Sequence, residues 1–402
     1  MNILLVVSSM NAESGGVTTI VAGISDALSQ RGHNVCVATV DHSGTQVNPT
    51  LATVTRFTAD KGWKSLSPSR ELAAFLRRRV REFDIVHVHG IWQRPGHYVG
   101  HYARRAGVPY VVSTHGMLDR SSLKMGRGWA KSLAWMLWDG PMIRRASAVQ
   151  CSNDAEYRVS PKLHGRNVFV AGNGVSAEAL STMPKRGSWR AKNLSTLGRP
   201  DRPVALFLSR IHPKKGLERL LPHWPHLLKE YPDVLLVVAG AGSEADEKSV
   251  RAAAQAAGIG GSVFFAGQLV GLAKWEALVD ADLFVLPTHQ EAFSLAITEA
   301  LAASCPVIIT REANFDEIGP CRAGIIVDGR DMAQFVRAVG QVLSDPHLRQ
   351  EMGINGRRLV ESRFTWPTIA ERLELAYRFL CRAEPIPTKL RAGADALADI
   401  GR

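Results

Sequence analysis

Residues 281–310 read ADLFVLPTHQEAFSLAITEALAASCPVIIT, and this stretch shows the pattern of secondary structure most clearly. An apolar run at 282–288 leads into a polar loop, then a helical segment, then a second apolar run at 306–310. Short, continuously apolar runs separated by helices are typical of parallel strands that are buried on both faces of a sheet. The stretch therefore predicts one strand–helix–strand unit of an α/β protein.

The same alternation of apolar runs and helical patterns continues along the rest of the chain. The further runs lie at 2–9, 33–40, 84–90, 109–116, 148–153, 167–172, 204–209, 234–240, 262–267 and 324–329. Strands that alternate with helices in this way build parallel sheets. The chain is thus predicted to be α/β, with two Rossmann-like, doubly wound parallel-sheet domains.

The length of 402 residues also suits two domains rather than one core. We expect an N-terminal domain over 1–182 and a second domain over 204–365. Between them, residues 183–203 are polar, rich in Pro, Gly and Arg, and without periodicity, which predicts a linker. A last amphipathic helix and a Pro-, Gly- and Ala-rich tail occupy 366–402.

The charge is unevenly distributed. The net charge is +12, and residues 60–149 hold 16 Lys and Arg against 6 Asp and Glu. A basic face fits nucleic acid, anionic lipid or acidic glycan. No nucleic-acid motif accompanies it, so an anionic membrane surface is favoured and nucleic acid is not expected. The segments 70–83 and 128–138 place bulky apolar residues beside basic ones, which fits either a lipid interface or ordinary core-packed helices with a solvated basic face.

The cysteines and the start of the chain indicate the compartment. The five cysteines are scattered, with no CxxC and no Cys/His cluster, so we expect reduced thiols. The first residues lack a basic region and a cleavage site, and read as a strand rather than a signal peptide. No uncharged apolar run approaches the roughly 18 residues that span a bilayer. We expect a cytoplasmic protein, peripheral on the inner face of a membrane.

Two glutamates stand out in the opening stretch. Glu291 precedes the predicted helix and Glu299 lies within it, eight positions later. The intervening amides of Phe293, Ser294 and Leu295 fall at the helix N-terminus, where backbone N–H groups and the helix dipole attract anions. The segment therefore predicts a site for an anionic ligand, with carboxylates at its border.

The whole stretch 281–310 resembles the donor-site signature of the GT-B glycosyltransferases of retaining family 4, the glycosyl transferases group 1. The resemblance implies two facing Rossmann-like domains with a cleft between them, and a terminal helix that packs back on the first domain. It implies transfer of a hexose from a UDP- or GDP-linked sugar to a glycan or lipid-linked acceptor, with retained configuration. HVHGIW at 87–92 and THGML at 114–118 resemble a subgroup associated with bacterial surface polysaccharides.

The resemblance also assigns roles within the stretch. Glu299 would bind the ribose hydroxyls, Glu291 the hydroxyls of the transferred sugar, and the amides of residues 293–295 the diphosphate. Ala292 and Ser304 stand where the family usually has Gly, so the loop path can differ, although no charged group is lost.

Outside the stretch, the resemblance singles out His115, Arg210 and Lys215 as catalytic. His115 would contact the transferred sugar. Arg210 and Lys215 would neutralise the departing diphosphate, because fixed cations stabilise charge that develops on a leaving group. With these cations no metal cofactor is expected. Further donor-binding positions are Gly15, Gly16, Gly240, Gln268 and Leu269.

Other interpretations remain at this point. His87 and His89 alternate on one strand and fit a metal site, but no supporting ligand stands near them, so acceptor-side or packing roles are favoured. A nucleotide-sugar epimerase of the same architecture, or a non-catalytic nucleotide-sugar-binding subunit, is an alternative function. An NAD-dependent oxidoreductase lacks support, because the only glycine-rich echo, GAGSE at 240–244, does not follow the first strand.

Overall fold

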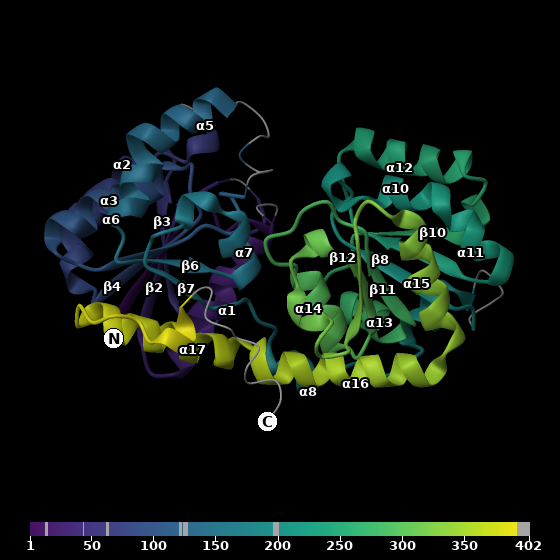
Figure 1. Ribbon diagram of the computed structural model, residues 1–402. Helices are drawn as coiled ribbons and strands as arrows, with labels where there is room; N and C mark the ends of the chain where they lie inside the picture. The colour runs from purple at the N-terminus through teal and green to yellow at the C-terminus, as the bar shows by residue number, and fades with distance from the viewer. Residues whose placement is uncertain are drawn as a thin grey trace. The chain divides into compact units, whose positions relative to one another are not determined.

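The computed structural model describes residues 1–12, 15–42, 44–61, 64–119, 123, 128–195 and 201–391. It forms two compact units. Unit 1 consists of Met1–Gly174 together with Thr365–Arg402, and unit 2 consists of Val175–Phe364. Each unit is built around its own parallel sheet covered by helices (Figure 1).

Unit 1 contains a seven-stranded sheet in the order β3-β2-β1-β4-β5-β6-β7, with every neighbouring pair parallel. The strands are β1 (Asn2–Val7), β2 (Asn34–Asp41), β3 (Thr53–Thr58), β4 (Ile85–His89), β5 (Tyr110–Ser113), β6 (Ala148–Cys151) and β7 (Val168–Val170). The order reverses beside β1, at the β1–β4 pair, as in doubly wound sheets, and ligands bind such sheets at the carboxyl ends of the strands.

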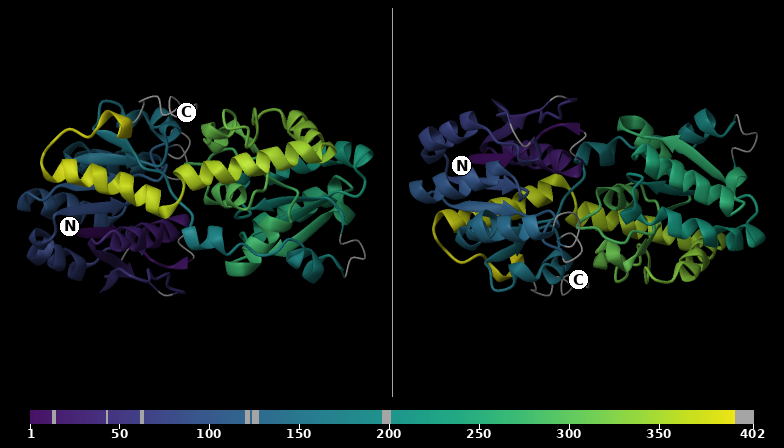
Figure 2. Two further views of the ribbon diagram at one scale, coloured as in Figure 1. Left: turned by 90° about the horizontal axis from the view of Figure 1, so that it is seen from below. Right: turned by 90° about the horizontal axis from the view of Figure 1, so that it is seen from above.

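The helices of unit 1 include the last helix of the chain. They are α1 (Gly16–Gln30), α2 (Arg70–Arg79), α3 (Arg94–Ala106), α5 (Gly128–Ala134), α6 (Gly140–Arg145), α7 (Asp154–Val159) and α17 (Trp366–Cys381), with a π-helical turn at Trp135–Asp139. Figure 2 shows α17 beside α1. Gly23 permits this contact, because a Cβ there would lie 2.2 Å from the Trp366 ring. The family resemblance implied this placement of the last helix.

Unit 2 contains a six-stranded parallel sheet in the order β10-β9-β8-β11-β12-β13. The strands are β8 (Val204–Leu208), β9 (Leu235–Ala239), β10 (Val263–Gly267), β11 (Leu283–Leu286), β12 (Val307–Thr310) and β13 (Gly324–Val327). The helices are α8 (Ala177–Ser181), α9 (Ser188–Asn193), α10 (Leu217–Leu220), α11 (Trp224–Glu230), α12 (Glu244–Ala256), α13 (Gly271–Asp280), α14 (Leu295–Ala302), α15 (Met332–Ser344) and α16 (Pro346–Arg363).

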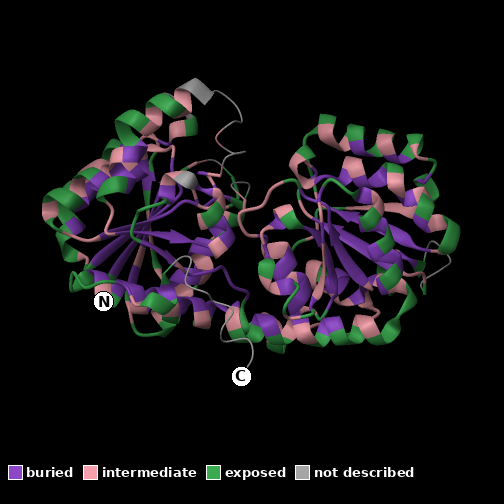
Figure 3. Ribbon diagram, viewed as in Figure 1, coloured by how far each residue is buried: buried purple, intermediate pink, exposed green. Residues whose placement is uncertain are grey.

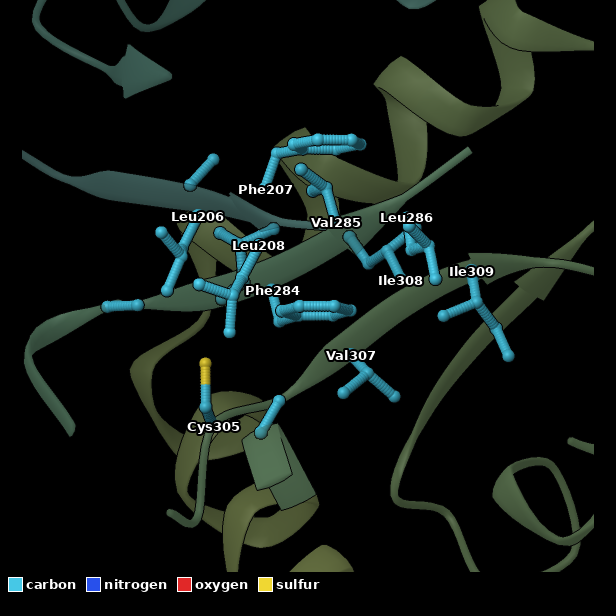
Figure 4. Close-up of a cluster of buried hydrophobic side chains, with 14 of the residues drawn as sticks. Leu206, Phe207, Leu208, Phe284, Val285, Leu286, Cys305, Val307, Ile308 and Ile309 are labelled. Carbon is cyan, nitrogen blue, oxygen red and sulfur yellow. The ribbon is translucent and has the colours of Figure 1, made fainter. Parts of the chain in front are cut away.

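The strands form the cores of both units. In Figure 3 the sheets are coloured as buried while the outer faces of the helices are exposed. In unit 2, side chains of β8, β11 and β12 pack together around Phe207 and Phe284, which are both 0% exposed (Figure 4). Strands buried on both faces explain why their sequences are continuously apolar rather than alternating. The α/β, two-domain prediction is confirmed, and every predicted strand is present.

The domain boundaries differ from those expected from composition. The chain passes from unit 1 to unit 2 after Gly174, and returns after Phe364, rather than at residues 182 and 365. The described part of 183–203 is not a linker but a part of unit 2. Trp189 of α9 is only 2% exposed in the core of that unit, and Arg190 forms an ion pair with Asp282 at 2.7 Å. This polar segment is therefore held in unit 2 by the buried Trp189 side chain and by the ion pair of Arg190.

Strand β3 was not predicted from the sequence. Its residues TVTRFT are mostly polar, and only Phe57 is buried. As the edge of the sheet, β3 pairs on one side alone. The five cysteines are free thiols, and Cys151 and Cys305 are buried. Within the described ranges, none of the helices has both the length and the apolar character that crossing a membrane demands.

Candidate active site

The loops after the strands of unit 2 meet at one edge of its sheet, because they follow the carboxyl ends of parallel strands. Backbone contacts join several of these loops. The amide of His289 donates to the Lys214 carbonyl at 2.7 Å, which joins the loops after β8 and β11. The Gly240 amide donates to the Gly267 carbonyl at 2.7 Å, which joins the loops after β9 and β10. The Ile211 amide donates to the Ala241 carbonyl at 2.9 Å, which joins the loops after β8 and β9, so these four loops form one connected surface.

Two glycines make this connection possible. Gly216 has φ +72°, and a Cβ there would lie 1.9 Å from the Pro287 carbonyl oxygen. Gly240 has φ +154°, and a Cβ would lie 1.9 Å from the Ser209 carbonyl oxygen. Only a residue without a side chain lets these backbones approach so closely. Gly240 is thus needed for the close approach of the loops after β8 and β9, and its predicted role in donor binding is a separate question.

Lys215 and Glu291 form an ion pair at this edge. Their side chains are only 15% and 11% exposed. The backbone of Glu291 is held on both sides, since its amide donates to the Glu312 carbonyl at 3.0 Å and its carbonyl accepts from the Asn314 side chain at 2.6 Å. The structure thus brings together two predicted site residues, and the ion pair holds both side chains in position at the edge.

Arg210 follows β8 on the same loop as Lys215, and its side chain is exposed. Within the described ranges it has no ion-pair partner. A guanidinium presents a planar set of donors that matches phosphate oxygens. Arg210 is therefore an unneutralised cation at the edge, on the loop that also carries the paired cation Lys215.

Glu299 of α14 pairs with Lys274 of α13 at 2.6 Å. The two side chains are 14% and 24% exposed. Lys274 was missed in the sequence, where it is one basic residue in the first turn of an amphipathic helix. Its partner lies 25 positions away, so no local pattern reveals the pair.

The N-terminus of α14 lies between the two glutamates. The helix begins at Leu295 with Ser294 as N-cap, and it has no side-chain cap and no acidic residue in its first turn. The Phe293 ring packs against Phe315 and Phe364, with centroids 5.4 and 5.7 Å away, so that side chain is committed to the interior. The backbone amides of this turn are the groups that an anion can use.

The remaining donor-side positions of unit 2 follow β10. Gln268 is exposed, whereas Leu269 is half-buried and packs on the core. The side chain of Gln268 is thus free to contact a ligand, and Leu269 anchors the loop.

In unit 1, the loop after β1 leads into α1. Gly15 is the N-cap, with φ +86°, and Gly16 is the first helical residue. Among the described residues, neither a side-chain cap nor an acidic residue occupies this helix N-terminus. Backbone N–H groups at a helix start on the carboxyl edge of the sheet are groups that an anion can use, and the donor-binding role of Gly15 and Gly16 stays a prediction.

His115 follows β5 at the same edge of unit 1. Its Nε2 lies 3.2 Å from Nδ1 of His89, and the rings of His89 and His87 have centroids 4.2 Å apart and are tilted by 30°. Burial lowers the pKa of His115 to about 4 and that of His87 to about 3, because a buried imidazolium loses its hydration. All three rings are therefore neutral at pH 7. Among the residues that the structure describes, no group of three or more His, Cys, Asp or Glu is placed to hold a metal ion.

In unit 2, the start of α14 has no side-chain cap, and Glu291 and Glu299 stand on either side of it in the sequence, each paired with a lysine. Arg210 adds a cation without an ion-pair partner among the described residues. Such a set can hold a diphosphate and hydrogen-bond the hydroxyls of a sugar or ribose. Unit 1 offers an open helix N-terminus and a neutral imidazole. These are the features of a protein that binds a nucleoside diphosphate sugar.

Comparison with known proteins gives the class and the family. Residues 14–179 match the family described as Glycosyltransferase Family 4, and residues 190–359 match Glycosyl transferases group 1. The protein is a glycosyltransferase with the GT-B fold, and it belongs to family 4.

Named relatives agree with this assignment. The chain is 29% identical over 397 residues to the GDP-mannose-dependent alpha-mannosyltransferase of Mycolicibacterium smegmatis, covering 93% of this chain and 96% of that protein. It is 27% identical over 324 residues to the GDP-mannose-dependent alpha-(1-6)-phosphatidylinositol monomannoside mannosyltransferase of the same organism, covering 76% and 80%. Among solved structures, sucrose-phosphate synthase from Thermosynechococcus elongatus superposes with a TM-score of 0.74 at 20% identity, covering 96% of this chain and 100% of that one.

Proposed function

We propose that the protein is a retaining hexosyltransferase that transfers a hexose from a nucleoside diphosphate sugar to a glycan or lipid-linked acceptor in bacterial cell-surface polysaccharide synthesis. The observation that carries the proposal is the edge of unit 2. There Glu291 and Glu299, each paired with a lysine, stand on either side of the uncapped start of α14 in the sequence. Arg210, on the loop of Lys215, has no ion-pair partner in the described part of the chain.

Each charged group has a role in this reaction. Arg210 and Lys215 neutralise the diphosphate as it leaves, and the first-turn amides of α14 bind its oxygens. Glu299 accepts hydrogen bonds from the ribose hydroxyls, and Glu291 accepts them from the transferred hexose. Because protein cations neutralise the leaving group, the proposal includes no divalent metal.

Retention follows from attack on the face that the diphosphate leaves. The bond from the anomeric carbon to the phosphate oxygen breaks, and the bond to the acceptor oxygen forms on the same side. The acceptor proton passes to the departing diphosphate, so charge and atoms balance. Fixed cations suit this path, because negative charge accumulates on the leaving group before the new bond is complete.

The donor proposal starts from the relatives. Both of the Mycolicibacterium smegmatis proteins are named for GDP-mannose, and one of them for a phosphatidylinositol acceptor. We therefore place GDP-mannose first among the UDP- and GDP-linked hexoses, and a lipid-linked glycan first among acceptors.

A lipid acceptor would bring the protein to a membrane, and exposed side chains of unit 1 support a membrane-facing surface there. Four large apolar side chains are exposed at 42 to 63% on α5 and the following π-helical turn, namely Leu133, Met136, Leu137 and Trp138. Neighbouring α3 and α2 border a cavity of about 470 Å³ that Arg77, Arg81 and Arg105 line without any acidic residue. Arg94, at the other end of α3, lies over the Trp138 ring at 5.8 Å. An exposed apolar group with an arginine against it, on a unit that also has this arginine-lined cavity, fits an anionic bilayer surface.

The transfer assay uses purified protein, GDP-mannose or UDP-glucose, and lipid-linked acceptors, with and without EDTA. We expect product in the presence of EDTA, and a one-bond carbon–proton coupling at the anomeric carbon of the product that matches the donor configuration, since this coupling distinguishes the anomers of mannose as well as of glucose. Arg210→Ala is expected to lower kcat about 100-fold or more. Arg337→Ala, which removes an exposed arginine of α15, is the matched control and is expected to leave turnover unchanged.

Specific outcomes contradict the proposal. An inverted product excludes retention, and loss of activity in EDTA excludes a metal-free reaction. Conversion of the donor to another nucleotide-sugar without acceptor identifies an epimerase, and binding without any turnover identifies a non-catalytic subunit.

Vesicle co-sedimentation tests the membrane surface. We expect binding to phosphatidylglycerol-containing vesicles but not to pure phosphatidylcholine, and loss of binding in Met136→Ser/Leu137→Ser. Ile354→Ser, which alters an exposed apolar residue of unit 2, is the control and should bind as the wild type does. Equal sedimentation of all variants with both vesicle types contradicts a surface of this kind.

A further inference from the structure

A buried carboxylate lies beneath the loop that carries His115. Glu156 is a residue of the short helix α7 and is 0% exposed. One of its oxygens, Oε1, accepts from Thr114 Oγ1 at 2.7 Å and from the Gly116 amide at 2.6 Å. The other oxygen, Oε2, accepts from the Ser152 amide at 2.7 Å. A single carboxylate therefore binds both chain neighbours of His115.

The backbone of His115 needs such support. Its φ is +47°, in the left-handed region that residues other than glycine seldom occupy. A residue stays in that region only where the surroundings determine it. The bonds from Thr114 and Gly116 to Glu156 supply that constraint on both sides of the turn.

The position of Glu156 is itself fixed. Its amide donates to Asn153 Oδ1 at 2.7 Å, which caps α7, and Asn153 directly follows the Ser152 amide that binds Oε2. The carboxylate thus links the end of β6 to the turn after β5. Burial raises the pKa of Glu156 despite its hydrogen-bond donors.

His89 supports the imidazole ring in the same way that Glu156 supports the backbone. The rings of His89 and His115 are stacked at 5.4 Å with an interplanar angle of 20°, and the hydrogen bond joins His89 Nδ1 to His115 Nε2. The other nitrogen, His89 Nε2, is buried and has no partner among the described residues. A buried nitrogen lone pair without a partner costs less than a buried N–H without one. The proton of His89 is therefore on Nδ1, and it is donated to His115 Nε2.

The ring of His87, which packs against His89, is held by a chain of hydrogen bonds whose donors and acceptors can be assigned. The Gln150 amide nitrogen donates to the Ala171 carbonyl, so its Oε1 must accept the hydroxyl proton of Ser113. Ser113 in turn accepts from His87 Nε2 at 2.6 Å. His87 Nδ1 then accepts from the Tyr377 hydroxyl at 2.5 Å. His87 is thus a neutral, immobile ring against which His89 is packed.

We propose that Glu156 and His89 are positioning residues for His115. Glu156 holds the left-handed turn, and His89 sets the tautomer, so that the neutral imidazole of His115 carries its proton on Nδ1 and donates it in a hydrogen bond to a hydroxyl of the sugar substrate. This inference rests on the proposed function for the identity of the hydroxyl, but the tautomer and the turn are properties of the protein alone.

The tautomer is tested by NMR of protein labelled with 15N-histidine, without substrate. The wild type is expected to show His115 protonated at Nδ1. His89→Phe keeps a ring of similar shape without the donor, and is expected to move the His115 proton to Nε2. Wild-type protein with the proton on Nε2 of His115 overturns the assignment. Because this readout needs no turnover, failure of the proposed function leaves it intact.

The turn is tested by kinetics. Glu156→Gln keeps the shape but sets an amide NH₂ against one of the three donors, so at least one bond is lost. We expect kcat to fall about 10- to 100-fold with little change in the KM for the donor, since misplacing a catalytic group by a fraction of an ångström has effects of this size. Thr114→Val removes one bond only, and should give a smaller fall in the same direction even if Glu156→Gln does not fold.

The matched control is Glu374→Gln, a glutamate of the same unit that is 6% exposed and pairs with Arg31 and Arg378. It should lose thermal stability while it keeps wild-type kcat. If Glu156→Gln and Thr114→Val keep wild-type kcat, or if Glu374→Gln loses as much kcat as they do, the positioning role is wrong.

Discussion

Replacing Lys215 with Met isolates the ion pair at the edge of unit 2. The substitution keeps the length and apolar stem of the side chain but removes the charge, and it leaves the Glu291 carboxylate, 11% exposed, without its cation. Exposed ion pairs contribute up to about 1 kcal/mol, and breaking a fully buried pair costs about 3 to 5 kcal/mol. For a pair that is mostly but not fully buried, we expect a loss of about 2 kcal/mol in the free energy of unfolding.

The same substitution is expected to affect catalysis separately. Removing one fixed group that stabilises charge in the transition state lowers kcat about 100- to 1,000-fold. Stability is measured by urea unfolding, and kcat by transfer from the nucleotide-sugar. Lys248→Met is the control, because Lys248 pairs with Glu244 on the surface of the same unit, where the side chains are 74% and 82% exposed. That variant should lose less than about 0.5 kcal/mol and keep wild-type turnover.

The double variant Lys215→Met/Glu291→Gln separates the two effects. Replacing the stranded carboxylate by a neutral amide should restore about half of the lost stability without restoring turnover. The reasoning is refuted if Lys215→Met is as stable as Lys248→Met, or if it turns over at the wild-type rate.

Three further predictions concern the rest of the chain. Gly216→Ala should lower the free energy of unfolding by about 2 kcal/mol or more, because the residue has φ +72° and its Cβ would lie 1.9 Å from a backbone oxygen. Gly260→Ala is the control, since a Cβ there meets open space, and it should not lower the stability. Equal melting temperatures of the two variants would contradict the packing around Gly216. A maleimide should label the exposed Cys381 in the folded protein, and the buried Cys305 only after denaturation, as mass spectrometry of the intact protein will show. The pKa of His115 is lowered to about 4 in the folded protein, so below about pH 6.5 the unfolded chain binds a proton at this residue while the folded chain does not. The free energy of unfolding should therefore fall from pH 7 to pH 5. His115→Gln should make this dependence on pH weaker, as measured by calorimetry.

The sequence predicts the elements whose signal is local. Buried parallel strands are continuously apolar, so β8, β11 and β12 are evident from composition alone. The edge strand β3 has no such run, because only one of its side chains enters the core. The linker prediction for 183–203 was wrong because the composition of this segment is polar, whereas its attachment to unit 2 depends on tertiary contacts. These are the burial of Trp189 and the ion pair of Arg190 with Asp282, which the local sequence does not reveal.

The site shows the same division. Glu291 and Glu299 are candidates because they stand on either side of one helix start, and Arg210 and Lys215 are candidates because they match the paired cations of the resembled family. Lys274 and Glu156 cannot, because each acts on residues 25 to 42 positions away in sequence. Tertiary contacts of this kind also explain why Lys215, expected to face a diphosphate, is found paired with Glu291.

Calorimetric titration of the purified, metal-free protein with GDP-mannose, UDP-glucose and NAD, repeated with Arg210→Ala, shows whether the protein binds a nucleotide-sugar through this arginine. We expect saturable binding of one nucleoside diphosphate sugar without added metal, at least tenfold weaker in the variant, because the Arg210 guanidinium is proposed to bind the diphosphate. Equal affinity in the variant, or a response to NAD alone, would contradict this expectation.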